Sequence, residues 1–183
     1  MEPIAHGLWA AAAAVGVRGA YSGKLSVKRL VWWSIFADVL AFGPSIAAAI
    51  WLRLAGGLDP ATSHGGHLPH AHLGLPLYAA GHSIVVFAVV FGITTVVLRR
   101  VVFELLGWLL HILIDIPTHS LSYYATRFLW PVSDLRVDGI AWWTPWFWIL
   151  TYVLLGVVYV VLWRAGWLFG PPGWPGEREE TKS

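Results

Sequence analysis

Residues 111–119 carry the spacing of a metal-binding helix. His111 and Asp115 stand four residues apart, and His119 follows Asp115 by another four. A four-residue step in an α-helix rotates by about 40° and rises by about 6 Å, so His111 and Asp115 point the same way and can ligate one ion. Pro117 is expected to end or bend this helix, which leaves the role of His119 open. Because the chain has no cysteine, a metal here must be held by histidine nitrogen and carboxylate oxygen.

Three more side chains that can bind metal lie inside long apolar segments, namely His6, Asp38 and His82. The acids within these segments are Asp38, Glu104 and Asp115, and the same segments contain no Lys or Arg. An isolated charge inside a bilayer costs several kcal/mol, so such groups face a bundle interior, take up a proton or bind a cation. A divalent metal would satisfy the acids and the histidines together.

Two other polar features are expected to lie outside this site. Glu104 lies roughly 10 Å from His111 along the helix axis, and Arg100, four residues earlier, offers it a structural ion pair. A separate tract contains four histidines, His64, His67, His70 and His72. Its glycines and proline deny it a rigid geometry, so we interpret the tract as a loop that binds metal weakly or delivers it.

The composition indicates an integral membrane protein. Of the 183 residues, 57% are hydrophobic and 12% are charged, and the mean hydropathy is +0.65. A soluble domain carries about 25% charged residues. The composition therefore excludes a disordered chain, an ordinary soluble enzyme and a nucleic-acid-binding module, and no nucleic-acid partner is expected.

The apolar segments predict an all-α, polytopic membrane bundle of about five transmembrane helices. A spanning helix needs about 20 apolar residues. The expected helices cover residues 3–17, 30–52, 76–98, 101–119 and 141–163. The first is short for a full crossing, and the fourth is the most polar. Together they form one expected transmembrane domain over residues 1–169, followed by a polar tail over residues 170–183.

Basic residues next to the expected spans predict the orientation. They gather in three connections, with Arg18, Lys24, Lys28 and Arg29 after the first helix, Arg99 and Arg100 after the third, and Arg164 after the fifth. Connections rich in Lys and Arg stay in the cytoplasm. We therefore expect a multi-pass protein of a bacterial-type inner (plasma) membrane, with its N-terminus outside and its C-terminus in the cytoplasm.

Asp38 lies at a different depth from the other candidates if every span is a straight helix. Counting residues places Asp38 nearer to the cytoplasmic side than His82 or Asp115. The Gly43-Pro44 step predicts a kink or a break in the second helix, because proline removes a backbone donor. A break there would reduce the mismatch in depth and free backbone carbonyls beside the site.

Five short motifs are distributed over most of the chain. They read His6-Gly7, Ala37-Asp38, Gly81-His82-Ser83, Gly107-x-x-x-His111-x-x-x-Asp115 and Trp130-Pro131-x-Ser133. Together they resemble the YdjM-like group of bacterial inner-membrane metal-dependent hydrolases, and the helix with Pro117 and His119 is similar to a metal-binding helix of zinc-dependent phospholipase C. The resemblance implies a membrane-bound hydrolase that uses a metal. The chain departs from the group after Asp38, where a second carboxylate is usual, and before His82, where further polar residues are common.

These patterns lead to one expected site and function. The candidate ligands of a divalent metal, with Zn²⁺ as the expected ion, are His6, Asp38, His82, His111, Asp115 and His119. Asp115 and Asp38 are also the candidate catalytic residues, each as ligand or as general base. Three or more nitrogen and oxygen ligands with an open position form the catalytic pattern, in which the metal activates water for hydrolysis. The expected substrate is a membrane lipid or a lipid-linked ester or phosphoester.

Two other functions use the same residue types. Intramembrane Asp and His also mark the path of an ion or a proton through a transport protein. Polar side chains can instead hold transmembrane helices together in a non-catalytic interaction protein. Both remain alternatives at this point, because residue types and spacing do not distinguish them from a hydrolase.

Overall fold

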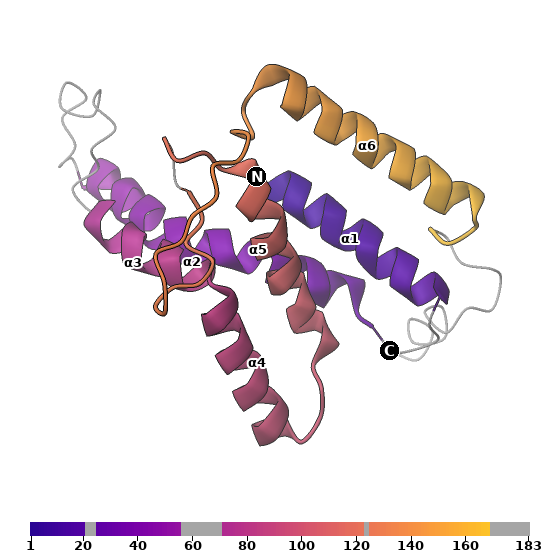
Figure 1. Ribbon diagram of the computed structural model, residues 1–183, viewed down its shortest axis with the longest axis horizontal. Coiled ribbons are helices and arrows are strands. Elements are labelled where there is room, and N and C mark those ends of the chain that lie inside the picture. The colour runs from indigo at the N-terminus through magenta and orange to yellow at the C-terminus, as the bar shows by residue number, and fades with distance from the viewer. Residues whose placement is uncertain (21–24, 56–70, 123–124, 169–183) are drawn as a thin grey trace.

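The computed structural model describes residues 1–20, 25–55, 71–122 and 125–168, and the regular elements among these residues are helices, with no β-strand (Figure 1). The elements are α1 (Pro3–Ala20), α2 (Val27–Leu54), α3 (Ala71–Gly81), α4 (Ile84–Leu98), the short 3-10 helix η2 (Phe103–Leu105), α5 (Leu106–Thr118) and α6 (Pro145–Arg164). The all-α class is therefore confirmed. The predicted polar tail and His64, His67 and His70 lie outside the described residues, and the side chain of His72 is not described either.

Within the described residues, two helices are long and apolar enough to cross a membrane, namely α2 and α6. A third crossing is possible if Leu75–Gly81 and Ile84–Leu98, which are bent by 61° at a break, form one span. The 13 residues of α5 reach only about 20 Å, which is short of a bilayer core of roughly 30 Å. Two or three helices could thus span a membrane, and the predicted bundle of about five spans is not confirmed.

The break in the helices falls in the third apolar segment, where we had expected one helix over residues 76–98. Helix α3 ends at Gly81, and Ser83 begins α4 as its N-cap by accepting a hydrogen bond from the amide of Val86 at 3.1 Å. In contrast, α2 is one helix from Val27 to Leu54 with Pro44 inside it. The second helix is therefore not broken at Gly43-Pro44, and the structure has a break that was not predicted at His82-Ser83, next to a candidate ligand.

Helices α1, α3 and α5 pack against α2 at close range. A Cβ atom at Gly81 would lie 3.2 Å from the carbonyl oxygen of Ala37, and one at Gly107 would overlap the carbonyl oxygen of Leu30. The indole of Trp108 donates a hydrogen bond to the carbonyl of Gly81 and joins α5 to the end of α3. Two glycines therefore let α3 and α5 approach the backbone of α2 around Asp38.

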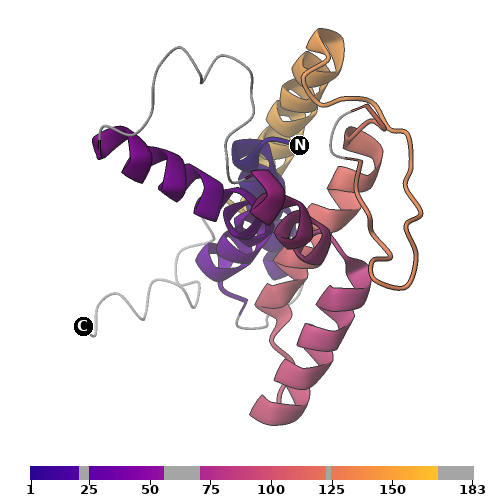
Figure 2. The same cartoon turned by 90° about the vertical axis from the view of Figure 1, so that its left-hand side faces the viewer.

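The segment after α5 folds back over the helix ends (Figure 2). The amide of Gly139 donates to the carbonyl of His119 at 2.9 Å, and the amide of Ile84 donates to the carbonyl of Phe128 at 2.9 Å. Helix α6 then runs beside α1, where the hydroxyl of Tyr159 donates to the carbonyl of Leu8 at 3.0 Å (Figure 1). Residues 119–122 and 125–144 thus cover both the end of α5 and the break between α3 and α4.

We predict that Gly107→Ala destabilises the protein by about 1–3 kcal/mol, because the new methyl group overlaps the backbone of α2, which cannot rotate away. Gly92→Ala is the matched control, since Gly92 lies in α4 and a Cβ there meets nothing within 4 Å. The control should be neutral or slightly stabilising, because alanine favours a helix over glycine. Thermal unfolding in detergent measures both variants, and equal stability of the two would contradict the close approach.

Candidate metal centre

Four of the predicted ligands meet at the point where three helices converge. Asp38 comes from α2, His82 follows the end of α3, and His111 and Asp115 stand one turn apart on α5. His82, His111 and Asp115 are 0% exposed, and Asp38 is 8% exposed. The groups that were expected to lie together from their types alone are therefore brought together, deep inside the protein.

Three ligand atoms form a nearly regular triangle. The Nε2 atoms of His82 and His111 are 3.1 Å apart, and each lies 3.2 Å from Oδ2 of Asp115. A Zn²⁺ ion at 2.0–2.1 Å from three such atoms would hold them about 3.3 Å apart in tetrahedral geometry. The triangle therefore has the dimensions of three corners of a metal coordination sphere.

Asp38 faces this triangle from α2. Its Oδ1 atom lies 3.8 Å from Nε2 of both His82 and His111. These separations exceed the tetrahedral value of about 3.3 Å. Asp38 therefore stands where a fourth, looser ligand or the acceptor of a water proton would be. Asp38, His82 and His111 are one group of side chains that could hold a metal ion, and His6, His111 and Asp115 are a second.

The backbone of α3 fixes the orientation of the His82 ring. Its Nδ1 atom lies 2.9 Å from the carbonyl oxygen of Tyr78, which can only accept a hydrogen bond. Nδ1 therefore carries a hydrogen, and Nε2 faces His111 and Asp115. The ring of Tyr78 stacks on the imidazole with a centroid separation of 3.9 Å. Metal-binding histidines commonly have such a carbonyl partner, which fixes both the tautomer and the ring.

Buried oxygen atoms in the site have unused acceptor capacity. Oδ2 of Asp115 and Oδ2 of Asp38 are buried and have no hydrogen-bond partner among the described residues. Nε2 of His82 and Nε2 of His111 each lie 3.2 Å from Oδ2 of Asp115. Removing a carboxylate oxygen from water without a partner is costly, and a cation would offset that cost. The described part of the site thus has two carboxylate oxygens that a bound cation could satisfy.

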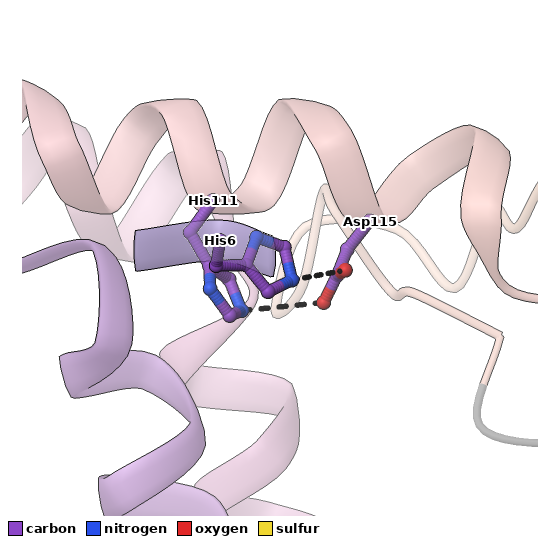
Figure 3. Close-up of side chains that lie close together, drawn as sticks. All are labelled: His6, His111 and Asp115. Carbon is purple, nitrogen blue, oxygen red and sulfur yellow. Dashed lines mark ion pairs between the residues drawn. The ribbon is translucent and has the colours of Figure 1, made fainter. Parts of the chain in front are cut away.

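His6 joins the site from α1 and contacts the opposite oxygen of Asp115. Its Nε2 atom lies 2.9 Å from Oδ1 of Asp115, and its ring stacks on His111 at 3.8 Å (Figure 3). The hydroxyl of Ser34 on α2 donates to the carbonyl of His6 at 3.1 Å and fixes this part of α1. The amino group of Met1 also donates to Oδ1 of Asp115. Asp115 therefore offers one oxygen to His6 and the other to His82 and His111.

His119 lies at the edge of the site. Helix α5 ends at Thr118, directly after Pro117, and His119 is its C-cap with an extended backbone. Nδ1 of His119 lies 3.2 Å from the carbonyl oxygen of Asp115 and 3.5 Å from Oδ1 of the same residue. His119 belongs to neither of the two groups that could hold a metal ion. Its contacts place it against the backbone that carries Asp115.

Glu104 is buried away from the centre, as expected, but its partner differs from the predicted one. It forms an ion pair with Arg29 of α2 at 3.2 Å, whereas Arg100 had been expected from the helical spacing. The helix that was predicted over residues 101–119 begins only at Leu106, after η2, so Arg100 and Glu104 do not share a helix. The ion pair instead joins the start of α5 to the start of α2.

Tyr78 is a residue of the site that the sequence had not indicated. It precedes His82 by four residues in α3, the same step that separates His111 from Asp115, so helical spacing could have suggested a contact. The amino group of Met1 had no sequence signal, because it reaches Asp115 across 114 residues. Comparison of the chain with protein-family models, with curated proteins and with solved structures gives no significant match.

We predict that the detergent-purified protein binds Zn²⁺ and that His111→Ala weakens this binding by about 100-fold or more. His111 belongs to both groups of ligands, and even an outer contact of a metal site is worth 10–100-fold in affinity. His119→Ala is the comparison, with a smaller expected loss of about 10-fold, because its Nδ1 contacts only the backbone carbonyl and Oδ1 of Asp115. Competition with a chromogenic chelator measures both, and unchanged Zn²⁺ affinity of folded His111→Ala would exclude the site.

Proposed function

We propose that this protein is a membrane-bound, metal-dependent hydrolase that acts on a lipid or on a lipid-linked ester or phosphoester. The observation that carries the proposal is the triangle of His82, His111 and Asp115 with Asp38 facing it. Two histidines and one carboxylate with an open fourth position are the ligand set of several catalytic zinc sites, whereas structural sites are closed by four ligands.

Zn²⁺ is the ion that the donor set favours. Imidazole nitrogens suit Zn²⁺ and other transition metals, whereas Mg²⁺ and Ca²⁺ prefer oxygen ligands alone. Two of the three atoms in the triangle are imidazole nitrogens. Zn²⁺ bound here would lower the pKa of a water molecule and polarise the ester oxygen.

The two carboxylates have different roles in this proposal. Asp115 is the third ligand, since its Oδ2 lies at ligand spacing from both histidines. Asp38 is the general base, because its Oδ1 lies farther from both histidines than Oδ2 of Asp115 does and can accept a proton from a water bound beside it. Asp38 takes one proton from the water, the water oxygen bonds to the acyl carbon or to phosphorus, and the ester bond breaks. The proton then passes to the leaving alkoxide, so an acid and an alcohol are released.

His6 is a positioning residue for Asp115. Its Nε2 contacts Oδ1, the oxygen that does not face the other two histidines. Such a contact holds a ligating carboxylate in one rotamer and turns its second oxygen toward the metal. His119 acts on the same residue through the backbone carbonyl.

The location of the centre supports an apolar substrate. The ligands lie on helices of which α2, and α3 with α4 as a bent pair, are candidate spans. A substrate with acyl or isoprenoid chains reaches such a centre from the bilayer without leaving it. We further propose the inner-membrane location and the orientation with the N-terminus outside, on the evidence of the basic connections.

A second candidate function is ion- or proton-coupled transport. It is favoured by a continuous row of titratable side chains, namely His6, Asp115, His111 and Asp38. The nitrogen–oxygen distance between successive side chains in this row is never above 3.8 Å. Such a chain can pass a proton. Proton flux in liposomes without turnover of any ester would support transport and exclude the hydrolase.

We predict that Asp38→Asn keeps its bound Zn²⁺ but lowers kcat by about 10²–10⁴-fold, the usual contribution of a general base. The assay uses the Zn²⁺-loaded protein with bis(p-nitrophenyl) phosphate and p-nitrophenyl butyrate as probes, and metal content is measured on the same samples. Glu104→Gln is the matched control, because Glu104 is also a buried carboxylate but pairs with Arg29 away from the centre. Normal turnover by Asp38→Asn would exclude its role as the base.

A further inference from the structure

A pocket of about 280 Å³ lies beside the metal centre. One wall is formed by α3, including Tyr78, and the other by the segment after α5, including Ser122, Arg127 and Arg136. Ligand pockets usually have volumes of about 300–1,000 Å³, so this one has room for a small group but not for long hydrocarbon chains.

Tyr78 lines the pocket and also contacts a ligand of the metal centre, His82. Its ring stacks on His82 at 3.9 Å, and its carbonyl oxygen accepts the hydrogen bond that orients the same imidazole. The ring also lies 6.5 Å from that of His119. A group in the pocket is therefore separated from the ligand triangle by one aromatic ring.

The charge of the pocket is positive. Arg127 pairs with Asp134 at 3.4 Å, and the carboxylate of that pair is 74% exposed. Arg136 forms no ion pair within the part of the chain that the structure describes. An exposed pair contributes little and leaves its partners free to exchange. Two guanidinium groups thus border the pocket, and none of its described lining residues is acidic.

Guanidinium groups are suited to phosphate. The planar fork of arginine donates two parallel hydrogen bonds to phosphate oxygens, and it remains charged at any physiological pH. The hydroxyl of Ser122, which pairs with that of Ser120 at 2.9 Å, adds a further donor to the same wall.

We propose that this pocket binds the phosphate of the substrate and that the substrate is accordingly a phosphate-bearing lipid. This inference rests on the proposed hydrolase function and narrows its substrate class from lipid esters in general to esters of a lipid that also carries a phosphate. The phosphate sits between Arg127 and Arg136 on the far side of Tyr78, and the hydrocarbon chains remain outside the pocket because its volume excludes them.

The test measures binding, not turnover, on the full-length Zn²⁺-loaded protein. The probes are short-chain dihexanoyl phosphatidic acid, inorganic phosphate and, as the uncharged comparison, dihexanoyl glycerol, each titrated by calorimetry. The variant is Arg127→Gln with Arg136→Gln, and Arg100→Gln is the matched control. Arg100 follows the end of α4, about 20 Å along that helix from the break at His82-Ser83.

The double glutamine variant should bind phosphatidic acid at least about 10-fold more weakly, because charge-assisted hydrogen bonds contribute about 1.5–3 kcal/mol and 1.4 kcal/mol is tenfold in affinity. Arg100→Gln should bind as the wild type does. A double lysine variant of Arg127 and Arg136 should recover part of the affinity, since it restores the charge without the fork. Zn²⁺ content and thermal unfolding confirm that each variant is folded.

Each outcome has a defined meaning. If the double glutamine variant loses affinity for both phosphatidic acid and inorganic phosphate, the pocket is a site for the phosphate group itself. If it loses affinity for phosphatidic acid alone, the pocket recognises the lipid headgroup. Unchanged affinity in the folded double variant, or an equal loss in Arg100→Gln, overturns the pocket. If the wild-type protein hydrolyses the p-nitrophenyl probes but the binding experiment excludes the phosphate site, the proposed hydrolase function stands. If the pocket binds phosphate but no probe is hydrolysed, the hydrolase function alone is excluded.

Discussion

The burial of two carboxylates next to three imidazoles is the interaction on which the rest of the structure depends. Asp38 and Asp115 lie within 3.8 Å of the same two histidine nitrogens, and each has a buried oxygen without a partner among the described residues. Such an arrangement is unfavourable in an apolar interior unless a cation neutralises it. The close approach of α3 and α5 to α2, permitted by Gly81 and Gly107, is what brings these groups within reach of one ion.

The helix break at His82-Ser83 connects the fold to the chemistry. Because α3 ends there, the His82 ring can form its hydrogen bond to the carbonyl of Tyr78. Helix α4 then continues at an angle of 61° to the preceding helix. Ser83 is the N-cap of α4 and also donates a hydrogen bond to the carbonyl of Trp130. This hydrogen bond holds the residues around Trp130 against the break. One local interruption therefore orients a ligand and provides the wall of the adjacent pocket.

The centre and the pocket divide the recognition of a substrate between two kinds of charge. The centre gathers acids and histidines where water is excluded, and the pocket presents arginines at a more open surface. A cation bound at the centre would be neutralised by its carboxylates, and an anion bound in the pocket would be neutralised by its arginines. Tyr78 lies between the two sites. This separation is consistent with one molecule that carries a phosphate beside the bond to be cleaved.

The sequence by itself determined the helical class, the membrane character and the set of His and Asp residues, because apolar run length and residue type are local properties. The i, i+4 pair of His111 and Asp115 could be predicted for the same reason. Only the tertiary structure decided which oxygen of Asp115 faces which histidine. It also decided that Glu104 pairs with Arg29 and not with Arg100. The position of the helix break, at His82-Ser83 and not at Gly43-Pro44, was likewise visible only in the structure. These features depend on contacts between helices far apart in the chain, which spacing along a single helix does not encode.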